Sequence, residues 1–225
     1  MCDSYKPVSK YYDSLSAIYS LGQIPRCRNA FKDEISDAVR GYGLTRLEVC
    51  FAGAGHGAEA ISLAEKGAMV TVVEISASML EVFQRKLSGA SDDTKARVNV
   101  IHDDIRNVQH RYDWVVANFF LNVFSESEMV GMVDVLLEKC SLHGSLVIGD
   151  FCYDTEGNGL VRMLQKMNWN LALSIFRILV KNAKHPIYDY QEHLSKLGCN
   201  REEVKYFGVL GVSFYQSARF TKAVE

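Results

Sequence analysis

Several features that mark specialised classes of protein are scarce in this sequence. Its 225 residues include three prolines, which favours long regular elements over rigid turns. No apolar run approaches the length of about 20 residues that a transmembrane helix needs. Residues 169–180 come nearest, and they include Arg177. The first residues are polar and carry no signal-peptide pattern. We therefore expect a cytoplasmic protein without an integral membrane segment.

Metal-site spacing is also missing. No two of the six cysteines form a C-x-x-C pair, the arrangement typical of zinc sites and redox dithiols. Several cysteines lie in apolar runs, where a free thiol behaves as a small hydrophobic side chain. This usage favours a reducing cytosol, and we predict no metal site.

Neither sign of charge is in excess. Twenty-five Lys and Arg stand against 27 Asp and Glu, which gives a net charge of −2. That balance does not draw the chain toward nucleic acid or an anionic membrane, so we expect no nucleic-acid partner. Aromatic residues make up 11%, enough to line an apolar pocket as well as a core. The composition predicts one globular domain over residues 1–225.

Strands alternate with helices along most of the chain, which predicts an α/β fold with a parallel sheet covered on both faces. The first 44 residues are expected to be helical, with Pro25 at the first position of a helix and residues 28–39 continuing it. Strands are expected at 45–51, 69–74, 97–101, 113–118, 145–151, 204–207 and 212–220, and helices at 58–66, 76–87, 125–140 and over much of 159–197. Ligands bind beyond the carboxyl ends of the strands in such sheets.

A glycine-rich turn follows the first predicted strand. Gly53, Gly55 and Gly57 let the backbone bend sharply and approach a ligand, and the next helix offers unpaired N–H groups to an anion. His56 in this turn is expected to contribute its backbone more than its imidazole. Glu74 ends the next strand, where it can accept hydrogen bonds from both ribose hydroxyls of a nucleoside.

The third and fourth strands end in further candidate residues. Asp104 is preferred over Asp103 as the acceptor from an adenine amino group, because it directly precedes Ile105, which can lie on the ring. The fourth strand ends at Asn118, beside the expected ligand. Phe119, Phe120 and Phe124 follow it and can wall an apolar acceptor pocket, although core packing is the alternative for at least one of them.

Together these segments resemble the class I S-adenosylmethionine-dependent methyltransferases over roughly residues 40–155. The resemblance implies a Rossmann-like, seven-stranded, mostly parallel sheet with helices on both faces, in the order 3-2-1-4-5-7-6 with the last strand antiparallel. N-terminal helices and a helical cover at residues 155–197 would complete the domain. The implied cofactor is S-adenosyl-L-methionine, and its implied contacts are Tyr19, Gly53, Ala54, Gly55, Gly57, Glu59, Glu74, Ile75, Asp104, Ile105, Asn118 and Phe119.

Two details bear on the substrate and on the cofactor. Residues 12–26 are similar to the start of the ubiquinone/menaquinone C-methyltransferases, with Pro25 in place of a histidine, which hints at a small apolar or aromatic acceptor. Phe51 stands two residues before Gly53, where the family usually has an acid that anchors the cofactor's amino-acid end. Glu59 is a candidate substitute that would hold the ammonium group, or else an exposed acid favourable to the helix dipole.

Methyl transfer from a sulfonium mainly requires positioning and exclusion of water, but an acidic acceptor also needs a base. His185, Tyr188 and Asp150 are the candidates, and a structural hydrogen bond is the alternative for each. Two other functions stay open. One is an NAD(P)-dependent oxidoreductase, which the glycine turn fits loosely but the long N-terminal segment disfavours. The other is a non-catalytic binding protein with a methyltransferase fold, which Phe51 favours. The acceptor's identity and the oligomeric state are not predicted.

Overall fold

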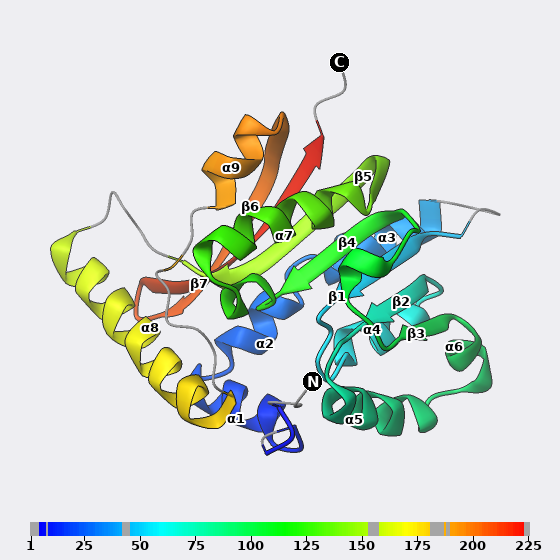
Figure 1. Ribbon diagram of the computed structural model, residues 1–225, viewed down its shortest axis with the longest axis horizontal. Helices are drawn as coiled ribbons and strands as arrows, with labels where there is room; N and C mark the ends of the chain where they lie inside the picture. The colour runs from blue at the N-terminus through cyan, green and yellow to red at the C-terminus, as the bar shows by residue number, and fades with distance from the viewer. Residues whose placement is uncertain are drawn as a thin grey trace.

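The computed structural model describes residues 5–7, 9–41, 46–152, 158–180, 187 and 190–222, excepting the side chains of 175–180. Its seven-stranded sheet has the order β3-β2-β1-β4-β5-β7-β6, as predicted, with helices on both faces (Figure 1). The strands are β1 Glu48–Ala52, β2 Met69–Val73, β3 Val98–Ile101, β4 Tyr112–Asn118, β5 Cys140–Phe151, β6 Cys199–Val209 and β7 Val212–Lys222.

Helices connect and cover these strands. They are α1 Tyr12–Tyr19, α2 Gln23–Arg28, α3 Lys32–Gly41, α4 Ala58–Glu65, α5 Ala77–Ser88, α6 Asp92–Ala96, α7 Glu126–Glu138, α8 Gly159–Val180 and α9 Tyr190–Lys196, with 3₁₀ turns η1 Ile105–Asn107 and η2 Leu121–Val123. No helix in the described part of the chain is both long and apolar enough to cross a bilayer.

The strand order reverses at β1, because β2 and β3 lie on one side of it and the later strands lie on the other. The strands β1 to β5 pair in parallel, and β7 runs antiparallel to β5 and to β6, as the resemblance implied. Because β1 has β2 on one side and β4 on the other, the loops after these strands diverge and leave a crevice between them. The topology therefore places the expected site beyond Ala52, Val73 and Asn118.

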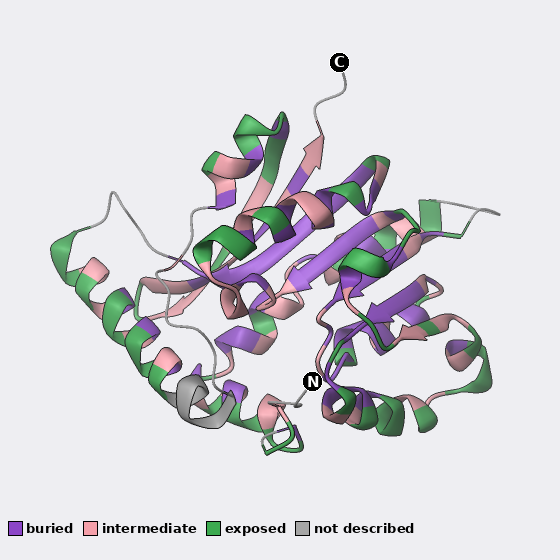
Figure 2. Ribbon diagram, viewed as in Figure 1, coloured by how far each residue is buried: buried purple, intermediate pink, exposed green. Residues whose placement is uncertain are grey.

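Successive side chains of each strand point to opposite faces of the sheet, so a hydrophobic core lies on each face. Val49 and Phe51 of β1 pack with α3, α4 and α5 on one face. Cys50 and Ala52 pack with α7 and α9 on the other, because successive side chains of a strand point in opposite directions. Figure 2 shows the resulting pattern, with buried strands inside helices that are exposed on their outer sides.

The N-terminal helices differ from the prediction. The expected helix at 28–39 is divided into α2 and α3, and Pro25 is the third residue of α2 rather than its first. A proline is tolerated there because the first N–H groups of a helix have no partner within the helix. The Asn29 side chain donates to the Pro25 carbonyl at 2.9 Å and closes the end of α2.

The structure also differs from the prediction at α7, β5 and α6. The capping box of Ser125 and Glu128 is present, as predicted, but α7 ends at Glu138, so the expected helix at 125–140 was too long. The strand β5 begins at Cys140 instead of residue 145, because Cys140 pairs with Tyr112 across a bulge. The helix α6, capped by the Ser91 side chain, was not predicted.

Candidate functional site

A cavity of about 310 Å³ lies beyond the carboxyl ends of β1, β2 and β4. Residues of the glycine turn, Glu74 and Ile75, the Asp103–Arg106 segment and the Asn118–Phe124 segment line it together. Further lining comes from the N-terminal helices and from α8. The structure thus brings together most of the residues predicted to bind a cofactor: Gly53, Ala54, Gly55, Glu59, Glu74, Ile75, Asp104, Ile105, Asn118 and Phe119.

The glycine turn exposes its backbone to the cavity. Gly53 and Gly55 have φ of 62° and 55°, in the left-handed region that favours glycine. A Cβ at Gly55 would meet no atom within 4 Å, whereas one at Gly53 would lie 2.3 Å from the Phe120 ring. Gly57 does not line the cavity, and a Cβ there would lie 2.5 Å from Phe83. Gly57 therefore serves packing, while Gly55 leaves room for a ligand.

Glu74 joins the glycine turn to the start of α5. Its Oε2 accepts from the Gly55 N–H at 3.0 Å, and its Oε1 accepts from the Ser76 N–H at 2.9 Å. The side chain is buried at the edge of the cavity. A carboxylate can accept more than two hydrogen bonds, so this arrangement orients Glu74 and still allows it to receive ligand hydroxyls.

The acids after β3 are engaged by their own loop. Asp104 Oδ1 accepts from the backbone N–H and the Nε of Arg106, both at 2.9 Å. These hydrogen bonds lower the pKa of Asp104 against the opposing effect of burial. Asp103 Oδ1 accepts from the Asp104 N–H at 2.7 Å. Both acids line the cavity together with Arg106, a residue that the sequence analysis did not consider.

Arg28 is the main cavity residue that the sequence analysis missed. Its Nε and Nη2 each lie 2.9 Å from an oxygen of Glu59, and its Nη1 lies 3.0 Å from Asp13 Oδ1. Burial opposes the charged guanidinium, but Glu59 and Asp13 outweigh it and raise the pKa of Arg28. Glu59 is therefore not an exposed acid, and its carboxylate is the counter-ion of a buried arginine. No local pattern signals a pair 31 residues apart.

Asp13 fixes α1 against the glycine turn. Its Oδ2 lies 2.8 Å from both His56 Nδ1 and Lys86 Nζ. Burial raises the pKa of Asp13, but His56, Arg28 and Lys86 outweigh that effect and hold it well below its usual value. His56 Nε2 also contacts the Ser9 carbonyl oxygen. The buried His56 ring therefore bridges two segments, a structural role that the sequence did not indicate.

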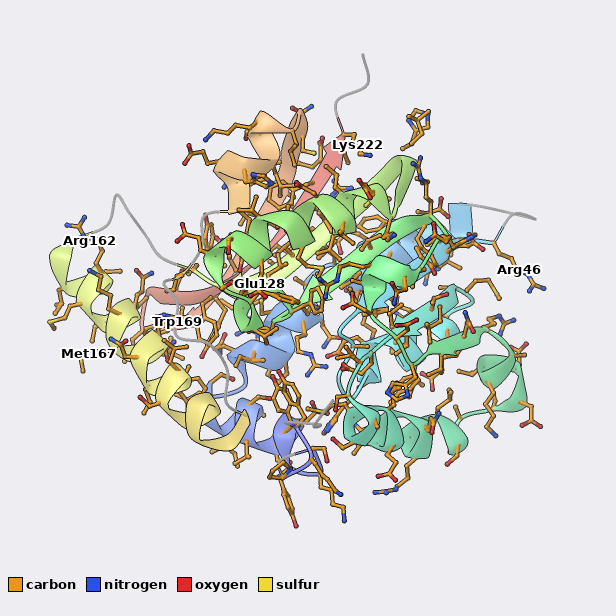
Figure 3. The ribbon with its side chains drawn as sticks, viewed as in Figure 1. Arg46, Glu128, Arg162, Met167, Trp169 and Lys222 are labelled. Atoms are coloured by element: carbon orange, nitrogen blue, oxygen red, sulfur yellow. The ribbon has the colours of Figure 1, made fainter. Side chains whose placement is uncertain are left out.

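The other end of the cavity is aromatic. Phe119, with φ of 53°, makes an edge-to-face contact with Phe151 at a centroid distance of 5.8 Å, and Phe151 makes another with Trp169 at 4.7 Å. Figure 3 shows Trp169 reaching inward from α8. Phe120 and Phe124 line the cavity and contact each other. These side chains act both as pocket wall and as core, so the two alternatives posed by the sequence are not exclusive.

Two asparagines place polar groups in this aromatic end. Asn118 Nδ2 donates to the Arg28 carbonyl at 3.0 Å, while its buried Oδ1 has no hydrogen-bond partner among the described residues. Asn122 Nδ2 donates to Asp150 Oδ1 at 2.9 Å. Asp150 also accepts from the Tyr190 hydroxyl and does not line the cavity. Its carboxylate therefore positions Asn122.

Tyr19 is a predicted cofactor contact that does not reach the cavity. The Tyr19 hydroxyl lies 2.6 Å from both the backbone and side-chain oxygens of Asn168, and Tyr19 is not part of the lining. Tyr12, from the same helix, lines the cavity instead. His185 and Tyr188 lie outside the described residues. Among the described residues, no cluster of His, Cys, Asp and Glu could hold a metal ion.

Comparisons with known proteins agree with this architecture. Residues 52–143 match a family described as a methyltransferase domain, a range that contains the glycine turn, Glu74 and Asn118. It covers less than half of the chain. The comparison with curated proteins returns no match.

Solved structures of methyltransferases are similar over most of the chain. Magnesium protoporphyrin IX methyltransferase from Synechocystis PCC 6803, with bound SAH, has a TM-score of 0.69 at 19% identity over 98% of both chains. The glycopeptide N-methyltransferase MtfA has 0.58 at 16%, over 85% of this chain and 90% of its own. A putative S-adenosyl-L-methionine-dependent methyltransferase from Methanococcus maripaludis has 0.58 at 16%, over 100% and 96%. At these identities the likeness establishes the fold, which is the Rossmann-like fold of methyltransferases.

Proposed function

We propose that this chain is an S-adenosylmethionine-dependent methyltransferase that acts on a small, largely apolar or aromatic acceptor. The observation that carries the proposal is the buried Glu74 carboxylate, held at the cavity edge by the N–H groups of Gly55 and Ser76. A carboxylate in this position of an open α/β sheet is placed to receive both hydroxyls of a ribose. The match of residues 52–143 to a methyltransferase domain supports the same ligand.

The residues around the cavity fit the remaining parts of that cofactor. The open space at Gly55 admits a ligand close to the backbone, and Asp103 and Asp104 lie at the end expected for adenine. The amino-acid end needs a donor for its carboxylate and an acceptor for its ammonium group. Arg28 has more N–H groups than its pairings with Asp13 and Glu59 use. Glu59, which lines the cavity beside Arg28, would be the acceptor. Glu59 would then take the place of the acid that is absent at Phe51.

When bound, S-adenosylmethionine supplies a methyl group already activated on a sulfonium, so the chain has to position the acceptor and exclude water. Phe119, Phe151 and Trp169 would hold an apolar acceptor by packing. Burial raises the pKa of Tyr12, so its hydroxyl stays neutral and can orient the acceptor by hydrogen bonding. His185 and Tyr188 remain the predicted bases for an acidic acceptor, and Asp150 would act by holding Asn122.

The acceptor class is the finer part of the proposal. Two structures with this fold are methyltransferases named for a protoporphyrin and for a glycopeptide, and a small-molecule acceptor agrees with both. The similarity of residues 12–26 to ubiquinone/menaquinone C-methyltransferases remains a hint toward an apolar ring. The aromatic end of the cavity supports that hint.

Calorimetric titration separates this proposal from the other functions. We expect saturable binding of S-adenosylhomocysteine in a one-to-one ratio and no binding of NADH. Transfer of a labelled methyl group to a panel of apolar and aromatic acceptors then tests catalysis. Binding of NADH without S-adenosylhomocysteine would indicate an oxidoreductase. Binding of S-adenosylhomocysteine with no transfer to any acceptor class would favour a binding protein.

A further inference from the structure

The outer face of α8 is apolar and exposed. Leu160, Met163, Met167 and Leu171 have exposed fractions of 58%, 50%, 59% and 55%. Their spacing of three and four residues places them within a strip roughly 80° wide along the helix. In Figure 3, Met167 points away from the body of the molecule, whereas Trp169 points toward it. The helix is therefore apolar on two faces, of which only the inner one packs against the protein.

The helix α1 and its flanks repeat this arrangement. Tyr11, Leu15, Ile18 and Leu21 recur every three or four residues and are 65%, 43%, 75% and 71% exposed. Of the thirteen large hydrophobic side chains that are exposed in the described part, eight belong to α8 or to residues 11–21. Exposed apolar side chains that are gathered on neighbouring helices, rather than scattered singly, mark a surface that meets a partner or a membrane.

The two helices are neighbours at the cavity. The Tyr19 hydroxyl at the end of α1 lies 2.6 Å from the Asn168 carbonyl oxygen of α8. Their inner faces supply Tyr12, Ser16, Trp169 and Leu173 to the cavity lining. We give the name α1/α8 surface to the eight exposed side chains, which are Tyr11, Leu15, Ile18, Leu21, Leu160, Met163, Met167 and Leu171. It lies on the outside of the two helices that enclose the apolar end of the cavity.

Positive charge borders the α1/α8 surface. The helix α8 carries the exposed Lys166. Lys6 and Lys10 are exposed just before α1. The acid of α1, Asp13, is already paired with Arg28, His56 and Lys86. The net charge of −2 for the whole chain therefore conceals a cationic border in this region.

We propose that the α1/α8 surface docks the protein onto an anionic lipid bilayer. Helices that lie in a membrane interface combine exposed apolar side chains with lysine and arginine, and anionic lipids attract those cations. A second copy of this chain is a poorer occupant, because a two-fold interface would place the cationic border against itself. The net charge of −2 indicated no attraction to anionic membranes, because net charge averages over the whole surface.

This docking does not depend on methyl transfer. If the proposed function also holds, an acceptor dissolved in the bilayer would reach the aromatic end of the cavity directly from the lipid. The two proposals are separable, because vesicle binding and cofactor binding are measured independently.

Co-sedimentation with vesicles tests the docking. We expect the protein to bind phosphatidylcholine vesicles that contain phosphatidylserine at least about tenfold more tightly than pure phosphatidylcholine vesicles. The double variant Met163→Glu/Met167→Glu should lose at least about tenfold in affinity for them. Lys6→Gln/Lys10→Gln should lose about fivefold per charge and flatten the salt dependence. The matched control is Leu142→Glu, at a side chain that is 70% exposed on β5, and it should bind as the parent does.

Three results would overturn the proposal. One is failure of the parent protein to bind vesicles that contain phosphatidylserine. A second is an equal loss in Leu142→Glu and in the α8 variants. The third is a concentration-dependent dimer, seen by sedimentation velocity and abolished by Met163→Glu/Met167→Glu, because it would assign the surface to a second copy. Circular dichroism and S-adenosylhomocysteine titration of each variant verify the fold, and absent cofactor binding in the parent would contradict only the proposed function.

Discussion

The two ends of the cavity are built in different ways. The end proposed to bind the nucleotide, here called the nucleotide end, consists of three short loops, each directly after a parallel strand, and its central contact joins Gly55 to Glu74 across 19 residues. The aromatic end, proposed to hold the acceptor, is assembled from α1, η2, β5 and α8, and contacts such as that of Tyr19 with Asn168 join residues 149 apart. Ligand binding at the nucleotide end would depend on single polar atoms. The shape of the aromatic end depends on the packing of large side chains.

Arg28 lies between the two ends and connects them. Its guanidinium pairs with Glu59, which follows the glycine turn, and its carbonyl accepts from Asn118 at the start of the aromatic segment. This comparison leads to the expectation that changes at the nucleotide end alter cofactor affinity, changes at the aromatic end alter stability, and Arg28 alters both.

Replacing Arg28 should have the largest effect. Arg28→Leu leaves the buried Glu59 carboxylate uncompensated, so we expect the free energy of unfolding to fall by about 3–5 kcal/mol. Urea denaturation measures it. The control is Arg40→Leu, which removes a fully exposed pairing with Asp37 and should change stability by less than about 1 kcal/mol. Similar values for both variants would contradict a central role for Arg28.

Trp169→Ala tests the aromatic end. Trp169 is 7% exposed and packs on Phe151. Its truncation should lower the free energy of unfolding by about 3 kcal/mol because it leaves a cavity in the core. Affinity for S-adenosylhomocysteine should stay within about twofold, since no polar contact to the nucleotide is lost. A large loss of affinity in a folded variant would mean that the two ends are not independent.

Glu74→Ala tests the nucleotide end. It should weaken S-adenosylhomocysteine binding by about 1.5–3 kcal/mol, the usual worth of hydrogen bonds to a charged group. Isothermal titration calorimetry measures the change, and Glu65→Ala, an exposed acid on α4, is the matched control. Unchanged affinity in a folded Glu74→Ala protein would remove the ribose assignment.

Asp13→Asn should have a smaller effect that depends on pH. The pKa of Asp13 is lowered in the folded state, so its contribution is present above the ordinary carboxyl pKa of about 4 and is lost as the pH falls toward the folded value. We expect Asp13→Asn to be less stable than the parent by about 1–2 kcal/mol at pH 7. The difference should shrink between pH 5 and pH 2, as urea denaturation across that range would show. A difference independent of pH would exclude the charge as its source.

The smallest effect is expected at the adenine end. Asp104→Asn should weaken S-adenosylhomocysteine binding by only about 0.5–1.5 kcal/mol, since Asp104 is already engaged by Arg106 and an asparagine amide oxygen can still accept from an adenine amino group. Comparison with Asp103→Asn by calorimetry identifies which acid faces the ligand. A larger loss in Asp103→Asn would reverse the choice made from the sequence.

The sequence predictions were accurate for the loops of the nucleotide end and missed the contacts between distant segments. The placement of Gly53, Gly55 and Glu74 at one cavity was predictable, because each follows directly on a strand, whereas the strand order came from the resemblance to the methyltransferases. The Arg28 network was not predictable, because Glu59 and Asp13 meet Arg28 only after α1 and α2 fold over the glycine turn. The role of His56 was missed for the same reason.

The sequence by itself determined the alternation of strands and helices, the left-handed glycines of the turn and the acid that follows β2. These are fixed by hydrophobic periodicity and backbone sterics, which act over a few residues. Only the tertiary structure decided that Glu59 neutralises Arg28, that Asp150 holds Asn122 and that Tyr12 rather than Tyr19 faces the cavity. A side chain's partner depends on which distant segments pack against it, and burial makes that pairing energetically decisive.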